Sequence, residues 1–309
     1  MNKVYIDTVR LLLDIAPLVF QSKYFALKGG TALNLFVQDL PRLSVDIDVV
    51  FTDYRMDRAD ALAKIAEELA AAKAAIEKIG YVVTMRRTKG GDEVKILVDD
   101  QVSQVKVEVN FVFRGFLLPI TKLPLTASTQ ELFSTNIILP VLDQAELYGS
   151  KLVAAMDRQH PRDIFDVRKM FEKFGLRPQF VDCFVAYLAG HNRPVHEVIF
   201  ANPQSLEQTF KNEFEGMTRE PVSLAELEQT HTRLFHELPR ALTPSHKEFL
   251  LSLVSMAPEW GLMPFENMKD LPAIRWKLQN LARLKAGNQE LFRLQHDELL
   301  ARFRALGPL

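Results

Sequence analysis

A glycine turn near the start of the chain has the composition of a phosphate-binding loop. Lys28 precedes Gly29 and Gly30, and Thr31 is the expected N-cap of a helix formed by the apolar run that follows. Glycine lets the backbone approach a ligand closely, and a helix N-terminus presents free N–H groups and partial positive charge to an anion. The turn therefore predicts a site for phosphate groups.

Two carboxylates follow on a strand-like segment. Asp46 and Asp48 alternate with apolar residues, so their side chains project to one face of the expected strand, roughly 7 Å apart along it. Neighbouring carboxylates repel each other unless a cation lies between them, and hard divalent metals prefer oxygen ligands. A phosphate loop beside a divalent-metal site suits phosphoryl or nucleotidyl transfer.

The elements that must position these residues predict an α+β domain with a mixed β-sheet flanked by helices. Residues 3–20 and 58–79 have the apolar periodicity of helices. Strand-like segments follow at residues 81–87, 93–98 and 104–113. A glycine turn at residues 89–92 makes the first two an expected hairpin. Residues 114–140 are rich in Pro, Thr and Leu and are expected to form a connector.

Glu108 lies on the third of these strand-like segments. Val105 and Val107 take one face of the segment, whereas Lys106 and Glu108 take the other. Glu108 is therefore either a third carboxylate on the metal side or part of an ordinary solvated polar face. Both interpretations remain open at this stage.

The second half of the chain has helical patterning almost throughout, so we expect a first domain over residues 1–140 and an all-α domain over residues 141–309. The expected helices cover residues 143–158, 161–174, 177–189, 204–214, 223–238, 245–256, 270–286 and 288–305.

A second group of charged residues opens this helical half. Lys151 lies among small and apolar residues, where a lysine usually extends its head group to solvent. Asp163 and Asp166 are three residues apart and share a face of the next helix, with Pro161 in its first turn. Capping of that helix explains Asp163 but not Asp166. Lys151 is therefore either a surface lysine or part of a charged site with these aspartates.

The composition excludes several classes of protein. The 38 Lys and Arg residues balance 39 Asp and Glu residues, so a nucleic-acid site would have to be a local basic patch. Cys183 is the single cysteine, which excludes an intramolecular disulfide and a cysteine-based zinc site, and we expect it to be buried. The histidines show no metal-ligand spacing. Without a signal pattern or a membrane span of about 18 apolar residues, we expect a cytoplasmic protein.

The combination of glycine turn, helix and Asp-x-Asp resembles the signature of the DNA polymerase β-like nucleotidyltransferase superfamily. More narrowly, the chain resembles the AbiEii/AbiGii family, the nucleotidyltransferase toxins of bacterial type IV toxin–antitoxin and phage-defence systems. The motifs that carry this resemblance are residues 28–33, Arg42-x-Ser44-x-Asp46-Ile47-Asp48-x-x-Phe51, and Lys151 followed by Asp157-Arg158-x-x-x-Arg162-Asp163-x-x-Asp166.

The resemblance implies a role for each matching residue. Nucleotide binding would fall to Lys28, Gly29, Gly30, Thr31, Ser44 and Lys151. Mg²⁺ would be bound by Asp46 and Asp48, with Glu108 as the candidate third ligand or base. The family's fourth-motif aspartate would be Asp166, with Asp163 as the other candidate. The helical domain would thus contribute Lys151 and one of these aspartates to the active-site cleft of a nucleotidyltransferase catalytic domain.

The resemblance also implies a reaction and partners. NMP would be transferred from an NTP to the 3′ end of tRNA, and a cognate antitoxin would be encoded nearby without needing a stable complex. The alternatives are transfer to a small molecule or protein, and a non-catalytic nucleotide-binding module.

Basic residues over 275–304, with Trp276 and with Arg86, Arg87 and Lys89, either contact RNA or form ordinary solvated faces.

Overall fold

The computed structural model describes residues 1–87 and 94–307, and the chain divides into two compact units. The first unit comprises Met1–Leu147 and Glu215–Pro221, and the second comprises Tyr148–Phe214 and Val222–Leu309. The division falls a few residues after the expected boundary near 140. Nothing in the sequence pattern indicated that a short segment after residue 214 returns to the first unit. The expected α+β class is confirmed.

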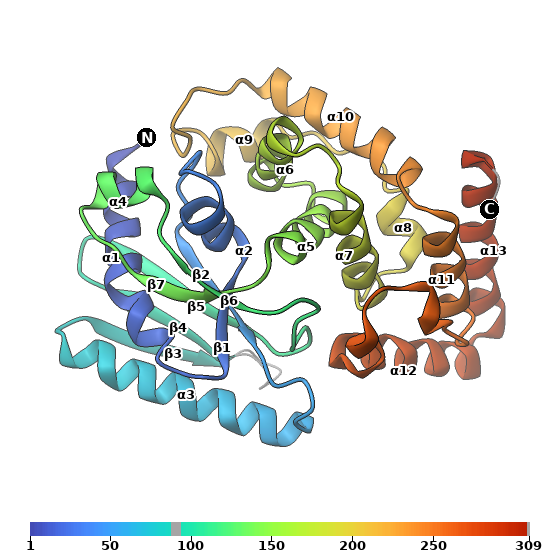
Figure 1. The fold of residues 1–309 in the computed structure, drawn as a ribbon, viewed down its shortest axis with the longest axis horizontal. Coiled ribbons are helices and arrows are strands. Elements are labelled where there is room, and N and C mark those ends of the chain that lie inside the picture. Colours follow the sequence, from blue (N-terminus) through green and yellow to red (C-terminus); the bar gives the residue numbers. More distant parts are fainter. Residues whose placement is uncertain (88–93, 308–309) are drawn as a thin grey trace. The chain divides into compact units, whose positions relative to one another are not determined.

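The first unit is built on a mixed seven-stranded sheet in the order β3-β4-β5-β2-β1-β7-β6 (Figure 1). Its strands are β1 (Phe25–Lys28), β2 (Asp46–Phe51), β3 (Val82–Arg87), β4 (Val94–Asp99), β5 (Gln104–Asn110), β6 (Thr121–Pro124) and β7 (Ile138–Val141). Its helices are α1 (Lys3–Val19), α2 (Gly29–Thr31), the π-helix η1 (Ala32–Val37), α3 (Arg58–Lys78) and α4 (Ala127–Phe133).

The apolar faces of the central strands form the core of this unit. Ile47 and Val49 on β2 and Val107 on β5 are fully buried, and α1 and α3 contact each other and the strands from β2 to β5. On α3, the buried residues recur at helical spacing, including Ile65 and Leu69. Because a strand's side chains alternate between faces, burial of these residues leaves the aspartates of β2 on the opposite face.

Two expectations about the rest of the sheet had different outcomes. Strands β3 and β4 pair antiparallel as expected, whereas the expected turn at residues 89–92 lies outside the described residues. The prediction of a connector over residues 114–140 was wrong, because β6, α4 and β7 occupy it and β7 pairs in parallel with β1. Each of these strands has only four residues, one of them a proline, so their sequences are too short to predict a strand.

The returning segment 215–221 is hydrogen-bonded to the loop that leads into β2. Leu43 N donates to Met217 O at 2.9 Å, and Arg219 N donates to Pro41 O at 2.9 Å. Met217 is buried. This segment therefore fixes the backbone immediately before Ser44 and the two aspartates.

The second unit is all-helical within the described residues. Helix α5 (Gln144–Asp157) begins in the first unit and ends in the second. The elements that follow are α6 (Pro161–Lys173), α7 (Pro178–Ala189), α8 (Val195–Ile199), α9 (Glu207–Glu213), α10 (Leu224–Arg240), α11 (Pro244–Val254), η2 (Trp260–Leu262), η3 (Glu266–Asp270), α12 (Pro272–Gly287) and α13 (Gln289–Leu306).

Helices α5 and α7 pack very closely at Gly149. A Cβ atom there would lie 2.4 Å from Cys183 Cβ and 2.7 Å from Phe184 N, so only glycine permits this contact. Cys183 is fully buried, as expected. Across the described residues, none of the helices has the length and apolar character required to cross a membrane.

Candidate active site

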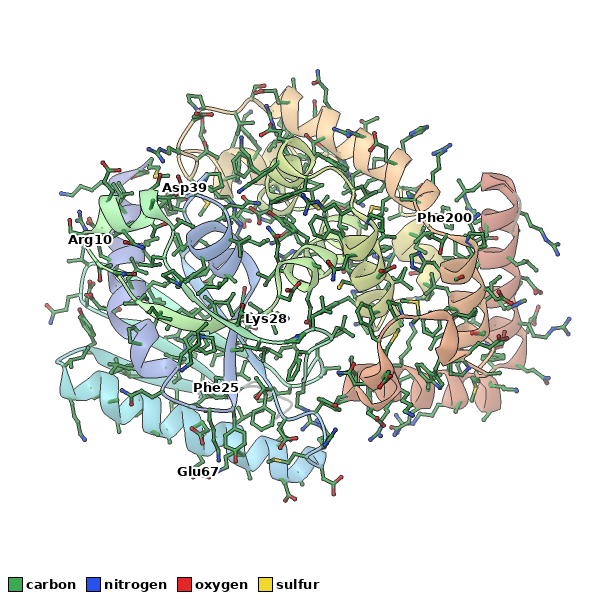
Figure 2. The ribbon with its side chains drawn as sticks, in the orientation of Figure 1. Arg10, Phe25, Lys28, Asp39, Glu67 and Phe200 are labelled. Carbon is green, nitrogen blue, oxygen red and sulfur yellow. The ribbon has the colours of Figure 1, made fainter. Side chains whose placement is uncertain are left out.

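The glycine turn joins the end of β1 to helix α2. Lys28, labelled in Figure 2, is the last residue of β1 and the N-cap residue of the helix. Gly29 has a φ of 73°, a left-handed conformation that a residue with a side chain adopts at a cost. The expectation that Thr31 is the N-cap was wrong. Its backbone is already helical, because the helical hydrogen bonds begin two residues earlier at Gly29.

The hydroxyl of Thr31 instead connects the turn to β2. Thr31 Oγ1 donates to the backbone carbonyl of Asp46 at 2.5 Å and lies 3.0 Å from Ser44 Oγ. Thr31 and Ser44 are both buried. The phosphate-loop candidate and the aspartate strand are thus hydrogen-bonded into one rigid element.

Both glycines of the turn are required by close neighbours. A Cβ atom on Gly29 would lie 2.0 Å from Asp48 Oδ2 and 2.8 Å from its Cγ. A Cβ atom on Gly30 would lie 2.9 Å from Arg42 Nη2 and 2.9 Å from Ser44 Oγ. The carboxylate of Asp48 and the guanidinium of Arg42 therefore lie directly against the backbone of the turn.

The two aspartates share one face of β2, as expected. Asp46 and Asp48 are partly exposed, whereas the residues between and after them are buried. In the sheet, Asp48 is the register partner of Lys28 on β1 and of Glu108 on β5. Asp46 is the register partner of Lys106 on β5. Register partners point to the same face, so this face carries carboxylates and lysines side by side.

Glu108 is held by two lysines. Its Oε1 lies 2.8 Å from Lys95 Nζ and its Oε2 lies 2.8 Å from Lys106 Nζ. Burial alone would raise the pKa of Glu108, but the hydrogen bonds from these two lysines outweigh burial and lower it. Within the described ranges, no three Asp, Glu, His or Cys side chains gather closely enough to hold a metal ion by themselves. A metal role for Glu108 stays a prediction.

The donor set on β2 nevertheless suits Mg²⁺. Mg²⁺ in proteins is commonly held by one or two carboxylates, with waters and substrate phosphates completing its shell. Asp46 and Asp48 supply two hard oxygen donors on one face, and Asp48 is in contact with the turn expected to bind phosphate. These residues fit a metal that is shared between protein and nucleotide.

The second unit contains a buried cluster of the other predicted residues. Lys151 Nζ on α5 lies 2.7 Å from Asp163 Oδ1 and 3.1 Å from Asp166 Oδ2 on α6. All three side chains are buried, with exposed fractions of 7 %, 1 % and 0 %. The interpretation of Lys151 as a surface lysine is therefore wrong. Helix α6 begins at Pro161, as expected, with His160 as its N-cap.

Asp163 accepts hydrogen bonds from two cations. Arg158 Nε donates to Asp163 Oδ2 at 2.6 Å and Arg158 Nη2 donates to Asp163 Oδ1 at 3.0 Å, so both oxygens of Asp163 accept from cations. Burial alone would raise the pKa of Asp163, but the charge of Lys151 and the Arg158 hydrogen bond hold it well below the usual 3.8. Asp163 is thus committed to holding Lys151 and Arg158.

Three residues of these clusters were not predicted as site residues from the sequence. Arg42, with 2 % of its surface exposed, donates from Nη1 to Leu43 O beside the turn. Lys95 and Lys106 neutralise Glu108 on the sheet. The alternating pattern of β5 placed Lys106 on the polar face, but the pairing with Lys95 required the register of β4.

The basic residues of α12 and α13 are only partly available to a ligand. Lys277 is buried and donates to Arg193 O at 2.6 Å. Arg275 pairs with Asp270. Trp276 is 41 % exposed, with the Arg283 guanidinium 5.3 Å from its ring centre. These helices therefore combine solvated salt bridges with one exposed aromatic.

Comparisons with known proteins agree with the resemblance seen in the sequence. The family model described as "Nucleotidyl transferase AbiEii toxin, Type IV TA system" matches residues 10–280. The fold is similar to that of MenT4, a nucleotidyltransferase toxin from Mycobacterium tuberculosis H37Rv, with a TM-score of 0.57 and 20% identity over 89% of this chain and 93% of that chain. No curated protein sequence matches. Because the family model spans most of its length, the chain belongs to the AbiEii family of nucleotidyltransferase toxins of type IV toxin–antitoxin systems.

Proposed function

We propose that this nucleotidyltransferase toxin transfers NMP from an NTP to the 3′ end of tRNA, with Mg²⁺ bound at Asp46 and Asp48. The observation that carries the proposal is the contact between Asp48 and Gly29, which unites the carboxylate pair and the phosphate turn in one site. What supports tRNA as the acceptor is the family resemblance. Salt bridges neutralise part of the positive charge of α12 and α13, so these helices give no separate support for RNA binding.

The residues of the turn would bind and orient the triphosphate. The N–H groups at the start of α2, at Gly30 and Thr31, are suited to phosphate oxygens, and Lys28 and Arg42 add positive charge beside them. Ser44 would keep the turn in register with β2 through Thr31. A metal at the two aspartates would supply Lewis-acid stabilisation of phosphate charge and lower the pKa of the attacking hydroxyl.

For the helical unit, we propose the roles that the resemblance implies. Lys151 would offset triphosphate charge, and Asp166 would be the fourth-motif aspartate. Asp163 is the weaker candidate for that role, because both of its oxygens already accept from Arg158 or Lys151. We therefore assign Asp163 to positioning Lys151. As a third metal ligand, Glu108 would use an oxygen that also accepts from Lys95 or Lys106.

The biological setting follows from the family. We propose that the reaction arrests growth by blocking aminoacylation in the cytoplasm, in the context of phage defence. An antitoxin encoded nearby would control the toxin, and a stable complex between the two would not be required.

The test is a transfer assay with purified protein, total tRNA, Mg²⁺ and each labelled NTP in turn. Asp48→Asn removes the negative charge with little change in shape, and Asp60→Asn is the matched control because Asp60 is an exposed carboxylate in the same unit. We expect label in tRNA with wild type and Asp60→Asn, and none with Asp48→Asn. Chelation of the metal should abolish transfer by the wild type.

Other outcomes would redirect or refute the proposal. Nucleotide binding that depends on Asp48, without labelling of any RNA, would refute the tRNA acceptor and favour a protein or small molecule. Transfer by Asp48→Asn at the wild-type rate would refute the assignment of the site. A metal-independent reaction would refute the role given to Asp46 and Asp48.

A further inference from the structure

A row of charged residues crosses the polar face of the sheet in the first unit. The register of the strands aligns Lys28 on β1, Asp48 on β2, Glu108 on β5 and Lys95 on β4. Two residues earlier on β2 and β5, Asp46 is the register partner of Lys106. Three ammonium groups therefore share this face with three carboxylates. The charges of these six side chains sum to zero.

Lys106 occupies the central place in this arrangement. Its ammonium lies 2.8 Å from Glu108 Oε2, and its strand is the direct neighbour of β2. Lys106 is the register partner of Asp46 on that strand, and Asp48 lies on the same face two residues further along. The aspartates of the candidate metal site therefore interact electrostatically with Lys106.

Glu108 fixes where this ammonium lies. Both of its oxygens accept from lysines, one on β4 and one on its own strand. It is 30 % exposed, and the two lysines are 29 % and 36 % exposed, so the three groups are only partly screened by water. Glu108 is thereby a positioning residue for Lys106.

We propose that Lys106, held by Glu108, is an internal counter-ion of the Asp46–Asp48 pair, which makes this chain bind a divalent metal as the metal–nucleotide complex rather than as the free ion. The inference rests on the proposed metal site. A free divalent ion would have to approach the two carboxylates against the repulsion of the Lys106 ammonium. A metal–triphosphate complex carries net negative charge, so it is attracted by the same ammonium that opposes the free ion.

The size of the effect follows from the spacing of neighbouring strands. Paired residues on adjacent strands are about 5 Å apart. If the Lys106 ammonium lies roughly 6 Å from a divalent ion in a water-like dielectric, Coulomb's law gives a repulsion that lowers the affinity for the ion about tenfold. Removing the charge of Lys106 should therefore raise the affinity for free metal by about tenfold.

The experiment measures Mn²⁺ binding by electron paramagnetic resonance, which needs no turnover. Wild type, Lys106→Met and the control Lys122→Met are titrated with Mn²⁺ alone. They are then titrated with each NTP as an analogue whose α–β linkage is carbon-bridged and cannot be cleaved. Lys122 is a suitable control because it is an exposed strand lysine on β6, at the far side of the same sheet.

We expect wild type and Lys122→Met to bind Mn²⁺ weakly alone and at least about tenfold more tightly with nucleotide. Lys106→Met should bind free Mn²⁺ about tenfold more tightly than wild type and gain less from nucleotide. Lys106→Gln serves the same purpose if the methionine variant is poorly folded. Unchanged or weaker binding of free Mn²⁺ by both variants would overturn the inference.

Two further variants separate the possible causes. Relative to Glu108→Gln alone, Lys106→Met with Glu108→Gln should bind free Mn²⁺ about tenfold more tightly; equal binding by these two variants would show that a released Glu108 binds the metal, and would overturn the counter-ion role. Asp48→Asn should abolish Mn²⁺ binding with nucleotide. If it does not, the proposed metal site itself fails, whereas an intact Asp48 dependence without a Lys106 effect refutes only the present inference.

Discussion

Replacing Gly29 by alanine tests whether the phosphate turn and the carboxylate pair act as one site. The new Cβ atom would lie 2.0 Å from Asp48 Oδ2, whereas ordinary contact begins at 3.4 Å, so that oxygen must move by about 1.4 Å. The Cγ and Cβ atoms of Asp48 would be only 2.8 and 2.9 Å away, so rotation of the carboxylate does not relieve the clash. The whole side chain has to be displaced.

The expected effect on activity is larger than the effect on stability. A displacement of about 1 Å at reacting groups costs on the order of 100-fold in rate. The left-handed φ of 73° adds a backbone cost of about 1–2 kcal/mol to the free energy of unfolding. We therefore expect Gly29→Ala to lose at least about 100-fold in kcat/KM while remaining folded.

Gly80→Ala is the matched control for the backbone cost. Gly80 also has a positive φ, of 97°, but a Cβ atom there has no neighbour within 4 Å. Both variants are measured by urea denaturation and by initial rates of NMP transfer. Gly80→Ala should lose only the stability that the backbone conformation costs and should keep its rate. Wild-type kcat/KM in Gly29→Ala, or an equal loss in Gly80→Ala, would refute the reasoning.

Three further predictions concern the helical unit. Lys151→Met should lower the free energy of unfolding by about 3–5 kcal/mol in a urea titration, because it leaves buried carboxylates uncompensated. Arg158→Gln should cost less than about 1 kcal/mol in the same titration, because the Arg158 side chain is 62 % exposed. Equal costs for the two variants would contradict the burial argument. Since the pKa of Asp163 is lowered in the folded state, its stabilisation is present above the ordinary value of 3.8 and is lost as pH falls below it. Thermal melts of Asp163→Asn should therefore decline less steeply with acid than those of wild type, and a steeper decline would disprove the role of this carboxylate. Gly149→Ala should destabilise the unit by about 1–3 kcal/mol, because its Cβ would lie 2.4 Å from Cys183 Cβ; an unchanged melting temperature would count against that close contact.

The features that the sequence predicted correctly are those decided by local physics. The glycine turn, the same-face placement of Asp46 and Asp48, and the start of α6 at Pro161 each depend on neighbours within a few residues. Glycine at a positive φ, alternation along a strand and proline in a first helical turn are rules of short range. The wrong expectation for Thr31 is also a local one: the helix begins at Gly29, so Lys28 and not Thr31 occupies the N-cap position.

The features that the sequence did not predict depend on pairing between distant segments. Residues 114–140 contribute to the sheet because β7 pairs with β1, which lies more than a hundred residues earlier in the chain. A strand of four residues has too little alternation in its sequence to predict that pairing. The buried state of Lys151 depends on α6 placing two carboxylates against it. Sequence spacing indicated a shared face for those aspartates, but not that the face is buried.

Glu108 illustrates the boundary between the two kinds of information. The sequence by itself determined that it lies on the polar face of a strand, because alternation depends only on the residues of β5. The tertiary structure decided its neighbours: β4 brings Lys95 to one oxygen, and β2 brings Asp48 alongside. Side-chain charge is encoded residue by residue, whereas the partner that neutralises it is set by strand register, and register is a property of the assembled sheet.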